Sequence, residues 1–130
     1  MTLQRLNPEG LSRSPAYSQV VVGTGTRIVF VAGQVAVDEG GKVVADDFPG
    51  QVKAVFTNVG RALTAAGARF QDVTKITIYV VDYSPEQLPA IGEGRMAVFG
   101  ETLPASTLVG VQALARPEFL IEVEAVAVLD

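Results

Sequence analysis

The chain of 130 residues contains no cysteine, no histidine and no tryptophan. Without cysteine there is no disulfide, no thiolate nucleophile and no cysteine-ligated metal. Without histidine there is no Ser-His-Asp triad and no imidazole general base. Any chemistry must therefore use carboxylates, hydroxyls, Lys, Arg, backbone groups or bound water. A carboxylate-only Mg²⁺ or Ca²⁺ site is the one metal centre that the composition leaves open.

Charged residues are scarce, at 18% of the chain against about 25% in an average soluble domain, whereas 48% of the residues are hydrophobic. No apolar run approaches the roughly 18–20 residues that span a bilayer, and the N-terminus lacks the continuous apolar segment of a signal peptide. We expect a single cytoplasmic domain over residues 1–130 with no membrane partner. The net charge of −4 argues against a nucleic-acid partner.

Runs rich in β-branched residues, separated by glycine turns, predict the strands. The first two flank a Gly-Thr-Gly-Thr sequence and are predicted to pair as a hairpin. The third is a short return strand after a second glycine turn. The predicted strands are residues 17–23, 27–33, 42–45, 73–81, 106–112 and 119–129.

Two segments have helical periodicity or helix-start signals. Apolar residues at steps of three and four over 52–66 predict an amphipathic helix that starts near Asp46 and ends before Gly67. A second helix is predicted over 85–99, with a short or broken first part because it contains Pro89 and two glycines. Both helices connect parallel strands, so right-handed crossovers place them on the same face of the sheet.

The strands are apolar on both faces, as in residues 28–31 and 78–81. Such runs are typical of sheets that are covered on both sides. Two helices cover only one side, so a single chain would expose a large apolar sheet face to water. We therefore expect an obligate homo-oligomer with closed symmetry.

Several motifs together resemble the RidA/YjgF family over nearly the whole chain. The N-terminal part carries NPEG followed by SPAYS, then VFVAGQ at the second strand. The central helix–strand unit and the Pro-Ala pair follow in the expected order, and IEVEA ends the match. These motifs are residues 7–10, 14–18, 29–34, 58–81, 104–105 and 121–125.

The resemblance implies an α+β, chorismate-mutase-like fold: a mixed sheet of about six strands with two helices on one face. It also implies a homotrimer whose sheets line a central β-barrel. Active members of the family hydrolyse enamines and imines to 2-keto acids and ammonia, in a small-molecule cleft between subunits. That chemistry needs no cofactor, no metal, no histidine and no cysteine, so the missing residue types are compatible with it.

The family site maps onto the chain residue by residue. Tyr17, Gly33, Gln34 and Glu122 match, with Glu122 expected to position water. The alternative interpretations are that Tyr17 packs at a subunit edge and that Glu122 and Glu124 form a solvated face of the last strand. Gly33 is expected where backbone approaches a neighbouring group closely.

Two ligand-binding positions depart from the family pattern. The carboxylate-binding Arg after the Pro-Ala pair is Ser106 here, and the polar or Cys position two residues on is Leu108. Losing a bidentate charged contact should cost about 2–5 kcal/mol of binding. The cleft is then expected to be less positive and to favour a neutral or larger ligand.

Other residues bear on how the missing guanidinium could be replaced. Arg13, Arg95 and Arg116 are candidates, and a family Asn of the second helix falls on Gly92. Ser106 is not predicted to be a nucleophile, because no histidine can activate it.

The acidic residues around the second glycine turn are interpreted as turn and helix-cap residues, since they lack the EF-hand spacing. They are Asp38, Glu39, Asp46 and Asp47.

Two functions from different classes follow. One is an enamine/imine hydrolase with an altered substrate range. The other is a non-catalytic small-molecule-binding homotrimer that lost its activity with the arginine. A ribonuclease is disfavoured by the acidic charge and by the absence of a basic–aromatic stripe.

Overall fold

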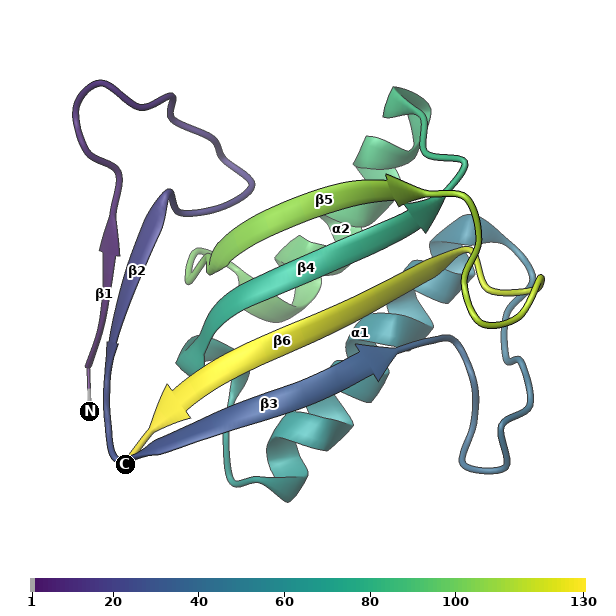
Figure 1. The fold of residues 1–130 in the computed structure, drawn as a ribbon, viewed down its shortest axis with the longest axis horizontal. Coiled ribbons are helices and arrows are strands. Elements are labelled where there is room, and N and C mark those ends of the chain that lie inside the picture. The colour runs from purple at the N-terminus through teal and green to yellow at the C-terminus, as the bar shows by residue number, and fades with distance from the viewer. Residues whose placement is uncertain (1) are drawn as a thin grey trace.

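The computed structural model describes residues 2–130, which form two α-helices and six strands (Figure 1). This confirms the predicted α+β class. In chain order the elements are β1 (Thr2–Leu6), β2 (Val20–Thr24), β3 (Arg27–Gln34), α1 (Phe48–Ala65), η1 (Phe70–Asp72), β4 (Val73–Val81), η2 (Pro85–Gln87), α2 (Leu88–Phe99), β5 (Ala105–Val111) and β6 (Ile121–Leu129), where η marks a single 3₁₀ turn.

The main sheet has four strands in the order β3-β6-β4-β5. β6 is antiparallel to both β3 and β4, and β4 is parallel to β5. The helix α1 connects the parallel strands β3 and β4, and α2 connects β4 and β5. As predicted, both helices lie on the same face of the sheet, behind it in Figure 1.

Local signals account for the helix ends. The Asp47 carboxylate accepts a hydrogen bond from the Gly50 N–H at 3.1 Å and caps the start of α1. Gly67 follows the end of α1 with a φ of 76°, the left-handed conformation that glycine adopts without strain. The second helix is broken as predicted, because a 3₁₀ turn precedes the regular part of α2.

The core lies between the helices and the sheet. Every second residue of β6 from Ile121 to Leu129 is buried against α1, and the intervening Glu122 and Glu124 lie on the opposite face. The Phe56 and Phe99 rings of the two helices meet edge to face at 6.3 Å. The core therefore occupies one side of the sheet only.

The predicted hairpin of residues 17–23 with 27–33 is wrong. β2 starts at Val20 and pairs with β1, so that the six strands form a four-stranded and a two-stranded sheet. The cause lies at the turn, where the Thr26 N–H donates to the Leu129 carbonyl at 3.1 Å. A Cβ on Gly25 would lie 2.7 Å from the same carbonyl oxygen. This attachment to the end of β6 separates β2 from β3.

The predicted return strand at residues 42–45 is also wrong. Only an isolated bridge between Val37 and Val43 forms there. The Asp38 carboxylate instead accepts hydrogen bonds from the Gly40 and Lys42 N–H groups, both at 2.9 Å. The segment is a side-chain-supported turn because its backbone groups are satisfied locally.

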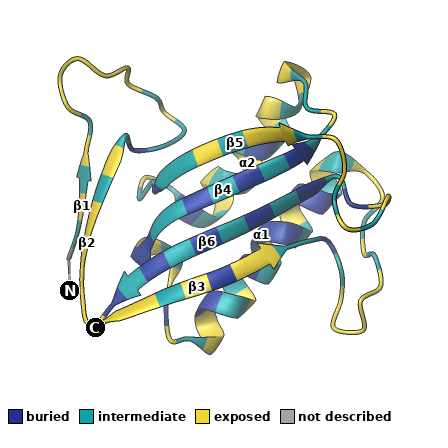
Figure 2. Ribbon diagram, viewed as in Figure 1, coloured by how far each residue is buried: buried dark blue, intermediate teal, exposed yellow. Residues whose placement is uncertain are grey.

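Within residues 2–130, no helix covers the other face of the main sheet, and β3 at its edge is largely exposed (Figure 2). Ile28 and Phe30 of β3 are 62% and 78% exposed there. Val109 of β5, at the opposite edge of the sheet, also lies on this face and is exposed. The single chain therefore has the uncovered apolar sheet face that its strand composition predicted.

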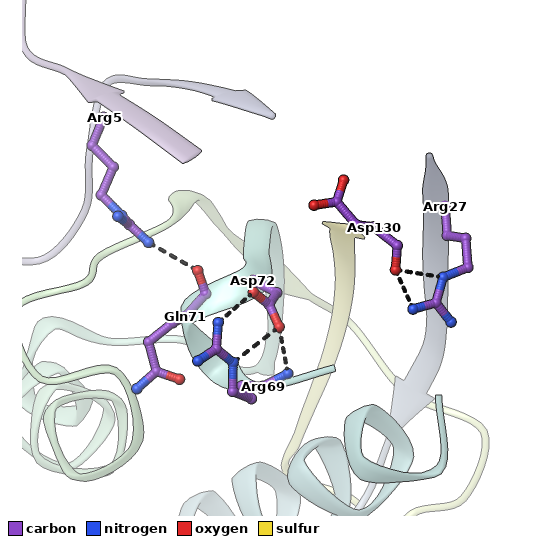
Figure 3. A network of polar contacts seen from close by, with 6 residues as sticks. All are labelled: Arg5, Arg27, Arg69, Gln71, Asp72 and Asp130. Atoms are coloured by element: carbon purple, nitrogen blue, oxygen red, sulfur yellow. Dashed lines mark hydrogen bonds and ion pairs between the residues drawn. The ribbon is translucent and has the colours of Figure 1, made fainter. Parts of the chain in front are cut away.

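Polar contacts fix the chain around η1 and the end of β6 (Figure 3). Arg5 of β1 donates to the Gln71 carbonyl at 3.0 Å, and Arg27 donates to the Asp130 carbonyl. Asp72 is buried and accepts the Arg69 N–H at 2.8 Å and the Arg69 guanidinium at 3.2 Å. Burial of the Asp72 carboxyl opposes ionisation, but these hydrogen bonds outweigh burial and lower its pKa.

The Asp72→Asn variant is expected to lose about 1 kcal/mol of unfolding free energy at neutral pH, because a neutral amide oxygen accepts the Arg69 N–H more weakly than the carboxylate does. The ion pair contributes little because the Arg69 side chain is 71% exposed. Since the folded-state pKa is depressed, the contribution is complete above the unfolded value of about 4 and declines as pH falls through the folded pKa. Urea unfolding between pH 2.5 and 7 measures the difference. Asp46→Asn, at an exposed position, is the control, and an equal loss there would contradict the assignment.

Candidate functional site

Gly33 and Glu122 meet on the open face at the end of β3. A β-bulge allows this: Val31 pairs with Ala125 and Gln34 with Val123, so β3 has two residues where β6 has one. A Cβ on Gly33 would lie 2.1 Å from Oε2 of Glu122. The carboxylate can therefore occupy this position only beside glycine.

Glu122 and Glu124 differ in their partners, although they share one face. The Tyr79 hydroxyl donates to Oε1 of Glu124 at 2.8 Å, and this hydrogen bond raises the pKa of Tyr79. Within residues 2–130 the Glu122 carboxylate accepts no hydrogen bond. Glu124 is thus held by the sheet, whereas Glu122 has lone pairs available for a water molecule or ligand.

Gln34 extends this group of residues. Its side-chain amide donates to the Ala32 carbonyl at 3.1 Å, and it lines a hollow with Asn58 and Arg61. The Asn58 amide donates to the Val35 and Val37 carbonyls at 2.9 and 3.0 Å. Asn58 thus anchors the chain after Gln34, and no local sequence pattern indicates this contact because it spans more than twenty residues.

Tyr17 and Ser106 form a second group at the start of β5. Ser18 is buried, its N–H donates to the Pro104 carbonyl at 3.0 Å, and its hydroxyl donates to the Leu103 carbonyl at 2.7 Å. These bonds hold Tyr17 beside the start of β5. The sequence gives no signal for the role of Ser18.

Ser106 and Leu108 lie on the helix-covered face of the sheet. Ser106 pairs with the buried Ile76 of β4, and Leu108 pairs with the buried Ile78. Leu108 packs against the core, so in this chain it is a packing residue. Ser106 is half-buried at the edge strand.

The candidate residues of one chain therefore form two groups. Gly33, Gln34 and Glu122 lie at one end of β3 and β6, and Tyr17 and Ser106 lie at the opposite end of β5. Three strand spacings separate β3 from β5, about 14 Å in all. Glu122 lies on the open face whereas Ser106 lies on the helix-covered face, so these two residues do not form one site within a single chain.

The three arginines considered as replacements have different surroundings. Arg116 already has two partners within the chain. It donates a hydrogen bond to the Gly41 carbonyl at 2.9 Å, and its guanidinium lies 4.5 Å above the Phe119 ring. Arg13 is exposed in the loop between β1 and β2. Arg95 is half-buried on α2, one turn after Gly92.

Within the described part of the chain, no three acidic side chains gather in a way that could hold a metal ion. None of the helices in residues 2–130 has the length and apolar character needed to cross a membrane.

Comparison with known proteins agrees with this architecture. A family model described as Endoribonuclease L-PSP matches residues 9–129. A crystal structure of a protein of the conserved Rid family, YyfB from Yersinia pestis, superposes with a TM-score of 0.93 at 38% identity, covering 99% of this chain and 100% of that one. The chain belongs to the Rid (YjgF) family.

Other relatives span most of this Rid protein. A RutC family protein from Pyrococcus abyssi is 39% identical over 113 residues, 85% of this chain and 84% of the relative. A rat protein named 2-iminobutanoate/2-iminopropanoate deaminase is 33% identical over 114 residues, 87% of this chain and 80% of the relative.

Gly33→Ala is expected to displace the Glu122 side chain, because the new Cβ cannot coexist with the carboxylate at 2.1 Å. A crystal structure of the variant measures the displacement. Unfolding free energies complete a cycle with Glu122→Ala: the cost of Gly33→Ala should disappear when Glu122 is already truncated. Additive effects, or an unmoved Glu122, would contradict this account of Gly33.

Proposed function

We propose that this Rid protein hydrolyses reactive enamines and imines formed from amino acids, releasing 2-keto acids and ammonia. The main observation concerns the Glu122 carboxylate, which lies against the Gly33 backbone. No group in residues 2–130 donates a hydrogen bond to it. Relatives named 2-iminobutanoate/2-iminopropanoate deaminase, about a third identical in sequence, support the reaction class.

The chemistry is a net addition of one water molecule. An enamine first tautomerises to its imine, as carbon takes up a proton and nitrogen releases one. Glu122 orients a water molecule and accepts one of its protons while the oxygen attacks the imine carbon. The C–O bond forms as the C=N π bond opens, and nitrogen takes up a proton. Collapse to the ketone breaks the C–N bond, and ammonia leaves with the remaining proton.

The complete site is proposed to form between subunits of a homotrimer. In one chain Glu122 of β6 and Ser106 of β5 lie on opposite faces of the sheet and toward opposite ends of it. The two strands are two spacings apart, about 10 Å sideways. A neighbouring copy can bring its second group to the first. Association also covers the exposed Ile28 and Phe30 on the open face, which we propose lines a central barrel.

A non-catalytic small-molecule-binding trimer is the second candidate, favoured by Ser106. A serine hydroxyl at the start of β5 supplies no charge for a substrate carboxylate. The wild-type protein, incubated with freshly generated 2-aminoacrylate, separates the two functions. Ammonia release no faster than in buffer would leave only the binding function for that substrate.

Glu122→Gln is expected to reduce kcat for 2-iminobutanoate hydrolysis about 10²–10⁴-fold, because the amide cannot accept the water proton. Coupled assay of ammonia release measures the rate. Glu124→Gln is the matched control, two residues along the same strand face, and should retain a rate close to wild type. Equal losses in both variants would contradict the assignment of Glu122.

Phe30→Glu is expected to convert the trimer to monomers, because it places a charge at the most exposed large apolar side chain of the open face. Native mass spectrometry gives the stoichiometry. Val44→Glu, at a position 53% exposed outside the sheet, is the control and should remain trimeric. A wild-type protein that is monomeric at micromolar concentration would exclude the intersubunit site.

A further inference from the structure

Arg95 differs from the other arginines in being half-buried without a partner. Within residues 2–130 it makes no hydrogen bond and no ion pair. Arg13 also lacks a partner, but it is exposed to solvent. The remaining five of the seven arginines all donate to a carbonyl or a side-chain oxygen: Arg5, Arg27, Arg61, Arg69 and Arg116.

The Arg95 guanidinium is partly removed from water. The residue is half-buried, and this burial lowers its pKa below the ordinary value. An arginine nevertheless stays protonated at any physiological pH. A positive charge that has lost part of its hydration without gaining an acceptor costs free energy, so an anion at this position is stabilised.

Helix geometry directs the Arg95 side chain toward the sheet. Ile91 and Phe99, four residues before and after it, are both buried, so all three leave α2 on the same side. A Cβ on Gly92 would lie 3.4 Å from a guanidinium nitrogen of Arg95. The guanidinium therefore lies back over Gly92, where the missing side chain leaves room for it.

The fold places Arg95 on the same side of the sheet as Ser106. The crossover helix α2 runs antiparallel to β5, ends at Phe99, and is followed by β5 from Ala105 onward. Arg95 lies about one turn before the helix end, and its guanidinium leans back toward Gly92. Ser106 lies at the start of β5 on the helix-covered face, and Tyr17 is held nearby through the bonds of Ser18 to Leu103 and Pro104.

We propose that Arg95 binds the carboxylate of the ligand at the start of β5, and that it thereby selects anionic 2-imino and 2-keto acids over neutral ligands. The inference rests on the proposed function and names the substrate class of the same site. It replaces the expectation of a neutral ligand that Ser106 suggested, because the charge missing from β5 is present on α2. The small residues Gly92 and Ser106 leave space for both the guanidinium and the carboxylate.

Calorimetric titration of the intact protein with 2-oxobutanoate and with its neutral analogue 2-oxobutanamide tests this assignment. Arg95→Gln should weaken 2-oxobutanoate binding at least about tenfold and leave 2-oxobutanamide binding unchanged. Arg95→Lys keeps the charge but loses the bidentate geometry, so its affinity should be intermediate. Arg27→Gln, at an exposed position at the start of β3, is the matched control for loss of an arginine, and Arg13→Gln tests the rival position.

A second variant covers the case in which Arg95→Gln does not fold. Gly92→Leu retains the charge but fills the space beside the guanidinium, and it should weaken 2-oxobutanoate binding selectively. Circular dichroism and native mass spectrometry establish that each variant is folded and has the wild-type stoichiometry.

Three outcomes would overturn the inference: wild-type affinity for 2-oxobutanoate in Arg95→Gln, a selective loss in Arg13→Gln instead, or no binding of 2-oxobutanoate by the wild-type protein. An equal loss of affinity for 2-oxobutanoate and 2-oxobutanamide in Arg95→Gln would also overturn it, because Arg95 would then have a structural role.

Failure of the inference can be distinguished from failure of the proposed function. If the wild type binds 2-oxobutanoate through Arg95 but does not accelerate imine hydrolysis, the inference stands and the hydrolase does not. If the wild type hydrolyses 2-iminobutanoate and Arg95→Gln keeps the same KM, the hydrolase stands and the inference does not. When both hold, Arg95→Gln raises KM more than it lowers kcat.

Discussion

The structure depends on the alternation of side chains along β6. This strand lies between β3 and β4 and buries every second residue from Ile121 to Leu129 against the helices. Because the side-chain period of a strand is two, a shift of register by one residue would expose the core and bury Glu122 and Glu124. The position of the core and the position of the Glu122 carboxylate are therefore consequences of one pairing register.

That register also determines which candidate site residues a single chain can bring together. It places Glu122 on the open face beside Gly33, and it places Ser106 on the covered face of the far edge strand. A single sheet cannot bring these two positions together, because strands hold their neighbours at fixed spacings. A site that uses both groups requires a second copy of the chain, and the exposed apolar side chains on β3 favour the association that would supply it.

Elements with strong local signals were predicted well. Residues 73–81 form β4 with the predicted bounds, and α1 has the predicted cap and end. The hairpin was mispredicted because its Gly-Thr-Gly-Thr turn is a local signal, whereas the Thr26 bond to the Leu129 carbonyl connects residues more than a hundred positions apart. β1 was missed because TLQRL has no run of β-branched residues and gains its strand conformation from pairing with β2.

The sequence by itself determined the fold class, the chemistry that the missing histidine and cysteine exclude, and the candidate carboxylate Glu122. These depend on composition, periodicity and motif order, which are local properties of the chain. Only the tertiary structure decided which charged side chains have hydrogen-bond partners within residues 2–130. Glu124 accepts a hydrogen bond from Tyr79 whereas Glu122 accepts none, and Arg116 donates one to Gly41 whereas Arg95 donates none. Whether a charged side chain is paired depends on atoms brought close by folding, and no sequence pattern encodes those distances.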